Sequence, residues 1–439
     1  MRSAEHFLFG RRLRVAGLML SATLLLAACG GGGGGGGGGS ATTTPTTPTT
    51  PVVSSPATTT PAGSNVVPLV VDTGPAGAGR IANVPYATVT ICPPGSTSGC
   101  QTIDRVLVDT GSTGLRVFAS ALTSTAPFPA VTNSASVPYA QCATFINSYT
   151  WGSVRSADVA LGGLTASALP IQVMADPAYP GVPAACSRTG TSQNSAALLG
   201  ANGILGISGF VQDCGSACVG TAISAAYYTC SGGSTGTCTP SAVPLAQQVT
   251  NPIARLPSDN NGSMIQFPAV ASAGQATATG SLVLGIGTRS NNAVGSATAY
   301  AVNGSTGYLT TTYNGRVYNQ SAFDSGSNFY FFNDAAIATC SASGGTGSGT
   351  TSLYYCPAGT LTLSATVTGT NAAGTTVSFS IANATSMFNN TNAVIPNVGA
   401  TIGSNSVFLW GLPFFYGRSV FTAIQGQATP LGTGPYVGF

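Results

Sequence analysis

A short segment that ends in Asp-Thr-Gly-Ser or Asp-Ser-Gly-Ser occurs twice in this chain, and no other feature restricts the fold as much. The copies are Val106–Ser112 and Ser321–Ser327. Each is followed by an apolar segment with a glycine, Gly203–Ile207 after the first and Val407–Leu412 after the second. Aspartate and glycine lie 97 residues apart in the first half and 87 in the second. An internal duplication explains this order and spacing. Each half should then supply a buried strand ending in an aspartate turn, with an apolar strand beside it.

The composition favours strands and turns over helices. Only 5% of the residues are charged and 59 of 439 are glycine, while the length and the 43% hydrophobic content suffice for two domains. From about Asn65, short β-type runs alternate with Gly, Pro, Ser and Asn, which predicts an all-β fold. The clearest runs are Val66–Val71, Ala87–Cys92, Val106–Val108, Ile171–Met174, Ser281–Ile286 and Thr360–Val367.

Two segments are predicted to be helical. Val243–Ile253 is the best candidate for a short helix. Ala335–Ala338 could form a single turn, with Asp334 as its cap.

The first 28 residues have the pattern of a bacterial lipoprotein signal. Four arginines precede an apolar run, Val15–Ala28, which ends in small residues before Cys29. At 14 residues the run is shorter than the ~20 that a spanning helix needs. We expect residues 1–28 to be removed and Cys29 to carry lipid, which anchors the protein in the cell envelope, at the outer membrane or cell surface. An ordinary signal, in which the cysteine is incidental, is the alternative.

Residues 29–64 are predicted to form a disordered tether. Ten glycines follow Cys29, and a Thr/Pro-rich stretch continues to about Ser64. The first part is a flexible coil and the second tends to extended polyproline II, so neither can offset the entropy cost of folding. Residues 41–64, fully extended, would span roughly 70 Å at ~3.1 Å per residue and hold a domain away from a membrane.

The chain beyond residue 28 is formally neutral. It contains nine Arg and nine Asp, with no Lys, Glu or His, so the net charge of +3 originates in the signal. Nucleic-acid binding needs a basic face, and we expect no nucleic-acid partner. Membrane attachment should come from the lipid.

Ten of the eleven cysteines remain once Cys29 is assigned to the lipid. An even number in an exported chain predicts disulfides. Metal binding is the alternative, but there is no Cys-x-x-Cys pair, and no histidine beyond residue 28, so we expect no metal and no cofactor. The expected bridges are Cys92 with Cys100, Cys214 with Cys218, Cys230 with Cys238, Cys340 with Cys356, and Cys142 with Cys186 across a longer span.

Asp109 and Asp324 are the candidate catalytic residues. Without His, Lys or Glu beyond residue 28, the chain expected after removal of the signal cannot form a Ser-His-Asp triad, a Ser-Lys dyad, a Cys-His pair or a Schiff base. Acid–base chemistry is left to the nine aspartates, and only these two lie in matched loops. The other seven are expected to be turn or capping residues.

The duplicated motifs resemble those of the pepsin-like aspartic proteases, over most of residues 65–439. That family carries a hydrophobic-hydrophobic-Asp-Thr/Ser-Gly-Ser/Thr loop and a later hydrophobic-hydrophobic-Gly element in each lobe. Three further segments fit the family: Tyr149–Gly152 at its flap, Gly280–Gly285 near the end of its first lobe, and Pro413–Phe421 in its last strands. The resemblance implies a two-lobed all-β fold, with lobes at 65–290 and 291–439 and a cleft between them.

The resemblance also implies a function and a role for each loop residue. The protein would be an aspartic endopeptidase that hydrolyses a polypeptide substrate with water activated between two aspartates that share a proton. Trp151 would close over bound peptide, and the protein is expected to be a monomer. In the loops, Gly111 and Gly326 would admit the backbone, Thr110 and Ser325 would bond across to the opposite loop, and Ser112 and Ser327 would orient the outer carboxylate oxygens.

The sequence departs from the family at several positions. Trp151 stands where Tyr is usual, and the stretch from it to Gly162 looks short for a full flap hairpin. Asn202 and Trp410 also differ from the residues that are usual before the two glycine strands. These departures keep alternatives open: an inactive pepsin-like surface module that binds peptide or glycan, a glycosidase that uses two carboxyl groups, or a structural lipoprotein or adhesin.

Overall fold

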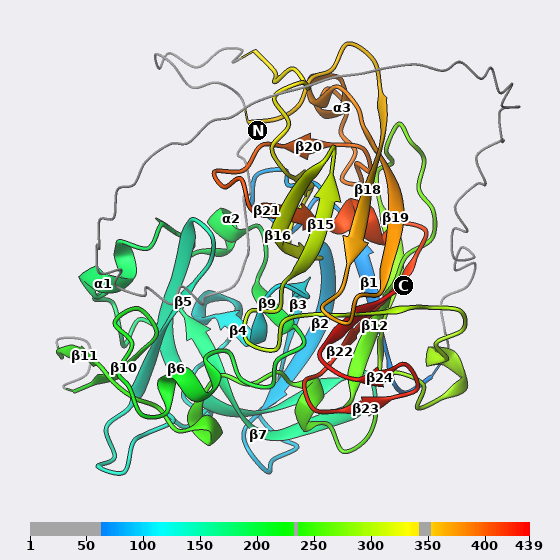
Figure 1. Cartoon of the computed structure of the whole chain (residues 1–439). Coiled ribbons are helices and arrows are strands. Elements are labelled where there is room, and N and C mark those ends of the chain that lie inside the picture. The colour runs from blue at the N-terminus through cyan, green and yellow to red at the C-terminus, as the bar shows by residue number, and fades with distance from the viewer. Residues whose placement is uncertain (1–62, 232–235, 342–352) are drawn as a thin grey trace, which may run out of the picture.

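The structure is a computed structural model and describes residues 63–231, 236–341 and 353–439. The predicted signal, Cys29 and nearly all of the predicted tether lie outside the described residues. Strands dominate the described chain and its helices are short, which confirms the predicted all-β class (Figure 1). Within the described ranges, no helix is long and apolar enough to cross a membrane.

The larger sheet contains 16 strands in the order β11-β10-β5-β6-β7-β4-β9-β3-β2-β1-β13-β12-β22-β25-β14, with β8 paired to β6. Its strands are β1 (Val66–Val71), β2 (Pro85–Cys92), β3 (Gln101–Asp109), β4 (Thr113–Phe118), β5 (Tyr139–Thr144), β6 (Ser148–Leu161), β7 (Leu164–Met174), β8 (Thr191–Ser192), β9 (Gly203–Ile207), β10 (Tyr227–Cys230), β11 (Cys238–Pro240), β12 (Gly262–Gln266), β13 (Ala278–Leu284), β14 (Ala299–Ala301), β22 (Ser419–Ala423) and β25 (Tyr436–Gly438).

A second sheet has seven strands in the order β19-β18-β15-β16-β21-β17-β20, and a small ribbon joins β23 to β24. These strands are β15 (Leu309–Tyr313), β16 (Arg316–Phe323), β17 (Tyr330–Phe331), β18 (Leu361–Thr368), β19 (Gly374–Ile381), β20 (Gly399–Ala400), β21 (Val407–Trp410), β23 (Ala428–Thr429) and β24 (Gly432–Thr433). The α-helices are α1 (Ala184–Ser187), α2 (Ala196–Leu199) and α3 (Ala384–Phe388).

The strands around the two aspartate loops repeat one arrangement. In the first half, β3 lies parallel to β9, β9 is antiparallel to β4, and β4 is parallel to β7. In the second half, β16 is parallel to β21, β21 is antiparallel to β17, and β17 is parallel to β20. Each aspartate therefore ends or directly follows a strand that has an apolar strand beside it, as the sequence repeat predicts; the glycine lies within β9 in the first half and directly after β21 in the second.

Each predicted β run lies within or largely overlaps an observed strand, but the predicted helix at Val243–Ile253 is wrong. Two single 3-10 turns, Leu245–Gln247 and Ile253–Arg255, stand there instead. Each turn begins just after a proline, Pro244 or Pro252, and the backbone is extended at Gln248, directly after the first turn. A proline lacks the N–H that a continuous helix needs at that point. The predicted turn at Ala335–Ala338 is present without helix, and Asp334 accepts from the backbone N–H of Ala336 at 2.8 Å.

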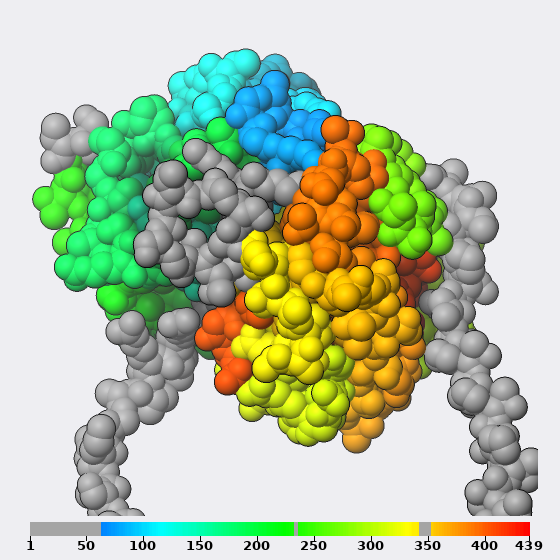
Figure 2. All heavy atoms as spheres, turned by 90° about the horizontal axis from the view of Figure 1, so that it is seen from above, coloured from blue at the N-terminus to red at the C-terminus, as the bar shows by residue number. Residues whose placement is uncertain are grey.

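One hydrophobic core extends through both sheets. Its buried members run from Val67 on β1 to Val437 on β25, and they include Phe323 and Trp410 from the second sheet. Seen from above, the cyan-to-green part of the chain gathers on one side of the molecule and the yellow-to-orange part on the other (Figure 2). The aspartate loops lie at the ends of strands that belong to these two parts.

Five disulfides link the described cysteines, and all are the predicted pairs. Four bridges join cysteines at most 16 residues apart, as expected for bridges that hold loops, and the fifth joins β5 to α1. The pairs are Cys92–Cys100, Cys142–Cys186, Cys214–Cys218, Cys230–Cys238 and Cys340–Cys356.

Candidate active site

The two aspartate loops meet, and the carboxyl groups of Asp109 and Asp324 form a hydrogen bond with each other. Asp109 is the last residue of β3, and Asp324 directly follows β16. Both residues have an exposed fraction of 0%. Two acids 215 positions apart in the sequence are thus joined in the interior of the protein.

Each carboxylate is held by its own loop in the same way. The backbone N–H of Gly111 donates to Asp109 Oδ1 at 2.7 Å, and the Ser112 hydroxyl donates to Oδ2. In the second loop, the N–H of Gly326 donates to Asp324 Oδ1 at 2.9 Å, and the Ser327 hydroxyl donates to Oδ2 at 2.7 Å. The donors fix the orientation of both carboxyl groups.

The loops are tied together by four hydrogen bonds that cross between them. The Thr110 hydroxyl donates to the carbonyl oxygen of Phe323 at 3.0 Å and accepts from the N–H of Ser325 at 2.9 Å. The Ser325 hydroxyl donates to the carbonyl oxygen of Val108 at 2.8 Å and accepts from the N–H of Thr110 at 3.1 Å. We call these four pseudo-symmetric hydrogen bonds the grip; they set the separation of the two aspartates.

The glycine in each loop allows the opposite aspartate to approach. A Cβ added at Gly111 would lie 2.6 Å from Asp324 Oδ1, and one added at Gly326 would lie 2.5 Å from Asp109 Oδ1. Carbon atoms do not come this close to carboxylate oxygens without a shift. The two glycines are therefore required for the carboxyl groups to meet.

Burial and mutual repulsion raise the pKa of the pair. The pKa of Asp324 lies well above its usual range because of burial first and the charge of Asp109 second. Burial also raises the pKa of Asp109, but the hydrogen bonds from Ser112, Asp324 and Gly111 and the charge of Arg116 oppose this rise. The two groups titrate as one coupled pair that retains a proton.

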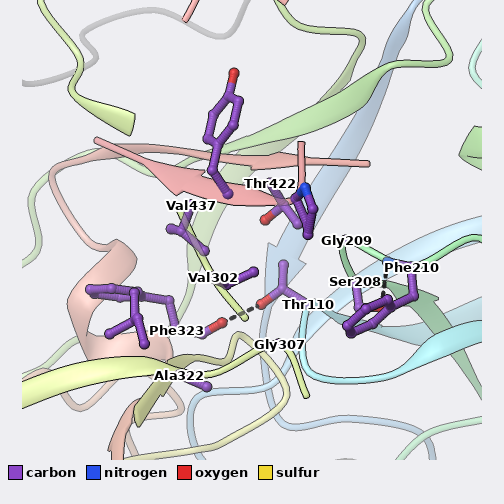
Figure 3. A pocket seen from close by; sticks show the side chains of 13 residues that line it. Thr110, Ser208, Gly209, Phe210, Val302, Gly307, Ala322, Phe323, Thr422 and Val437 are labelled. Carbon is purple, nitrogen blue, oxygen red and sulfur yellow. Dashed lines mark hydrogen bonds between the residues drawn. The ribbon is translucent and has the colours of Figure 1, made fainter. Parts of the chain in front are cut away.

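A cavity of about 30 Å³ lies behind the loops, with Thr110 on its wall (Figure 3). Its other walls come from β16, through Ala322 and Phe323, and from Thr422 on β22 and Val437 on β25. The space is the size of one water molecule. Strands of both sheets therefore line this cavity.

A protein-family model described as protein of unknown function (DUF3443) matches residues 61–439. The chain belongs to the DUF3443 family. No curated protein matches it. The match covers both aspartate loops and every described strand, so the site lies within the DUF3443 region.

Trp151 lies apart from the aspartate loops of this DUF3443 protein, in a different cluster of side chains. It is 1% exposed, pairs with Cys142 across the β5–β6 hairpin, and packs edge-on against Tyr228 with ring centroids 5.2 Å apart. Its indole N–H donates to the carbonyl oxygen of Tyr179 at 2.9 Å. This position agrees with a buried strand aromatic and gives no support to contact with substrate.

The hairpin tip between β5 and β6, residues 145–147, was missed by the sequence reasoning. Phe145 is buried with residues of the first half, such as Tyr86. Its neighbour Ile146 packs against a cluster that is formed mainly by the second half and includes Phe329 and Leu409. The tip thus bridges the two parts of the chain. Asn147, a turn-favouring residue between two β runs, was the available signal.

Asn83 forms a second bridge that the sequence did not indicate. It is buried and its side-chain amide donates to the carbonyl oxygens of Asn328, at 2.8 Å, and Ile395, at 2.6 Å. Its Oδ1 accepts from the N–H of Ile395 at 2.8 Å. Asn328 directly follows the second aspartate loop, so Asn83 connects the first half to that loop.

The other seven aspartates all have structural partners, but the prediction that they are turn or capping residues holds only in part. Four of them, Asp72, Asp158, Asp176 and Asp334, accept backbone N–H groups at loops. Five form ion pairs with arginine, namely Asp72 and Asp104 with Arg105, Asp176 with Arg155, Asp213 with Arg116, and Asp259 with Arg289.

Among the described residues, no group of three or more His, Cys, Asp or Glu side chains is placed to hold a metal ion. At the aspartate loops, the groups placed for acid–base chemistry are the carboxyl groups of Asp109 and Asp324.

Proposed function

We propose that this DUF3443 protein is an aspartic endopeptidase that hydrolyses peptide bonds with a water activated between Asp109 and Asp324. The observation that carries the proposal is the direct hydrogen bond between two buried carboxyl groups, each held by an equivalent loop. Structural carboxyl groups normally pair with a cation or with backbone N–H donors. Two acids that face each other instead hold one proton between them, which is the state that acid–base catalysis requires.

The roles of the two carboxyl groups follow from their surroundings. Asp109 has a nearby cation and three hydrogen-bond donors, so it is the carboxylate that accepts a proton from the attacking water. Asp324, whose pKa is raised further, supplies its proton to the carbonyl oxygen of the scissile peptide. Proton transfer from water to one acid and from the other acid to substrate leaves the total charge of the pair unchanged.

We further propose that the fold is the two-lobed, pepsin-like one, with lobes at 65–290 and 291–439 and a cleft between them. The repeated order of strands around each loop supports this proposal. The strands β22, β25 and β14 join the larger sheet although they belong to the second half, which is compatible with a sheet shared by two lobes.

The second candidate function is an inactive pepsin-like surface module that binds a peptide or glycan. The complete burial of both aspartates favours it, because a substrate must reach them before any reaction. The bridges made by Ile146 and Asn83 tie the two halves together at the site and would have to yield. A glycosidase is disfavoured, since hydrogen-bonded carboxyl groups are closer than the ≈5 Å that separates the two acids even in retaining glycosidases.

The cellular setting remains as the sequence predicts it. We propose an exported protein that is anchored in the cell envelope by lipid on Cys29 and acts as a monomer on a polypeptide. Lipid attachment can be measured by mass spectrometry of the native protein, and Cys29→Ser should abolish it.

Hydrolysis of an unfolded protein at acidic pH tests the proposed activity. We expect cleavage that a statine-type inhibitor blocks and that falls by at least about 100-fold in Asp109→Asn and in Asp324→Asn. Asp104→Asn is the matched control, because that side chain is 65% exposed and lies outside the loops. A wild-type protein that cleaves no faster than the two loop variants would exclude the peptidase and favour the binding module.

A further inference from the structure

Arg116 places a positive charge in the interior, next to the first aspartate loop. It lies on β4, is 3% exposed, and donates from Nη1 to the carbonyl oxygens of Thr113 at 2.7 Å and Gly114 at 3.3 Å. These carbonyls come directly after the Asp109 loop. In the larger sheet, Gly206 on β9 is paired with Asp109 on one side and with Gly114 on the other. Arg116 lies only two residues beyond Gly114 on β4.

The counter-ion of Arg116 is Asp213, which lies in the segment after β9. The two side chains meet at 3.2 Å, and the aspartate is 12% exposed. The Tyr227 hydroxyl donates to Asp213 at 2.6 Å, and the side-chain amide of Gln141 donates to its other oxygen. Burial raises the pKa of Asp213 to about 6 even though Arg116 opposes the rise. The group therefore titrates at mildly acidic pH.

Stability alone does not account for this buried pair. Removing two charges from water is costly, and a buried ion pair is often no better than an apolar pair of the same volume. Among the described residues, the Arg116 Nε–H and the Gln141 Oε1 atom are buried without a hydrogen bond, which adds to the cost. A costly charge next to two functional carboxyl groups points to an electrostatic role.

The charge of Arg116 acts unequally on the two catalytic carboxyl groups. It is among the influences that lower the pKa of Asp109, whereas the charge that acts on Asp324 is chiefly that of Asp109 itself. A cation on one side of a pair that shares one proton favours ionisation of the nearer acid. The charge of Arg116 thus makes the electrostatic environment of Asp109 differ from that of Asp324, although the two loops are otherwise equivalent.

We propose that Arg116, held by Asp213, is a positioning residue that keeps Asp109 as the ionised member of the aspartate pair and preserves this state as the medium becomes acidic. The catalytic meaning of this inference rests on the proposed peptidase function. The electrostatic coupling itself does not, because it concerns the charge state of the resting protein.

The acid dependence follows from the groups that face each carboxyl. Asp109 faces Asp324 and Arg116, while Asp213 faces Arg116 and Tyr227. Above pH 6, Asp213 is ionised and neutralises much of the Arg116 charge. As the pH falls, Asp213 takes up a proton and the charge of Arg116 acts more fully on Asp109, which opposes protonation of Asp109.

The test is a titration of the aspartate carboxyl carbons by NMR, in protein labelled with ¹³C at aspartate Cγ. The chain contains only nine aspartates, so each resonance can be assigned with single Asp→Asn variants. In Arg116→Gln we expect the Asp213 titration to move up by one pH unit or more, because an opposite charge in direct contact lowers an aspartate pKa by about 1–3. The Asp109 titration should move in the same direction, by more than about 0.3 pH unit. Arg116→Lys should restore much of the effect.

Arg155→Gln is the matched control. Arg155 also forms a buried ion pair, with Asp176 at 2.8 Å, but it does not act on the catalytic pair. This variant should leave the Asp109 titration unchanged. If Arg116→Gln does not fold, the double variant with Asp213→Asn removes both charges and should show the same upward movement at Asp109. The inference is overturned if the Asp109 titration stays within about 0.3 pH unit of wild type in whichever variant folds. A difference of that size is on the order of measurement error.

Peptidase assays separate this inference from the proposed function. An inactive wild-type protein with the expected NMR shifts would refute the peptidase and leave the coupling intact. In an active protein, the acidic limb of the pH–rate profile should move up in Arg116→Gln and stay in place in Arg155→Gln. A purely structural role for Arg116 would lower activity without moving that limb.

Discussion

Thr110→Val tests the grip between the two loops more directly than any change to the aspartates. Valine has nearly the same shape as threonine but lacks the hydroxyl. The substitution removes the hydrogen bond to the Phe323 carbonyl and the bond accepted from the Ser325 N–H, at 3.0 and 2.9 Å. Both partners are buried, so neither is open to bulk solvent.

The expected cost follows from these two unpaired groups. A buried donor or acceptor that loses its partner costs about 1–3 kcal/mol, so the variant should lose about 2–6 kcal/mol of unfolding free energy. Domains are typically stable by only about 5–15 kcal/mol. The substitution should therefore lower the urea midpoint markedly while leaving the slope of the transition unchanged.

Urea denaturation followed by tryptophan fluorescence measures this loss in the oxidised protein. Thr366→Val is the matched control, because its hydroxyl meets only the Thr376 hydroxyl, at 3.3 Å on the exposed face of the second sheet. It should change the stability by no more than about 0.5 kcal/mol. Equal effects of the two substitutions would refute the reasoning that the grip joins the halves of the molecule.

Two further predictions concern the site and its charges. In Gly326→Ala the new Cβ would lie 2.5 Å from the opposite carboxylate, so peptidase activity should fall by about 100-fold, whereas Gly359→Ala, with no atom within 4 Å, should retain it. Burial raises the pKa of Asp213 from 3.8 to about 6, so the folded protein binds this proton more tightly than the unfolded chain. Urea titrations should therefore show about 2 kcal/mol of added stability between pH 6 and pH 4 from this group. Asp213→Asn should reduce the gain by that amount, and Asp176 and Asp259, whose pKa values are lowered, should reverse the trend only below about pH 4; stability that falls steadily from pH 7 to pH 4 would contradict the assignment.

Local sequence signals were sufficient for the features that depend on neighbouring residues. The strand before each aspartate, the tight Asp-Thr-Gly-Ser turn and the short-range disulfides are each encoded within a few residues. The juxtaposition of Asp109 and Asp324 is not local, but the duplication made it predictable, since equivalent segments of a repeat are related by symmetry. The repeated motif therefore indicated a tertiary contact between the two aspartates that no local pattern could have indicated.

Features that depend on register or distant partners were not predictable. Trp151 was placed in a flap by its neighbours in sequence, yet the β5–β6 turn falls at residues 145–147 and puts the indole in the interior. Because side chains alternate between the faces of a strand, a small change in where a hairpin turns decides which face an aromatic takes. Arg116 and Asp213 are 97 residues apart and belong to no motif, so only the fold could reveal their contact.

The partners of the nine aspartates supply the strongest argument that the pair is there for chemistry. Seven of the aspartates are paired with an arginine or with a backbone N–H donor from a loop. Such partners offset the cost of removing a carboxylate from water. Asp109 and Asp324 have no such ion pair among the described residues, and their carboxyl groups face each other. Asparagine would avoid the repulsion at no loss of shape, so a purely structural site has no need of two acids. The retained repulsion, together with a buried cation that bears on one acid of the pair, is what a site for proton transfer requires.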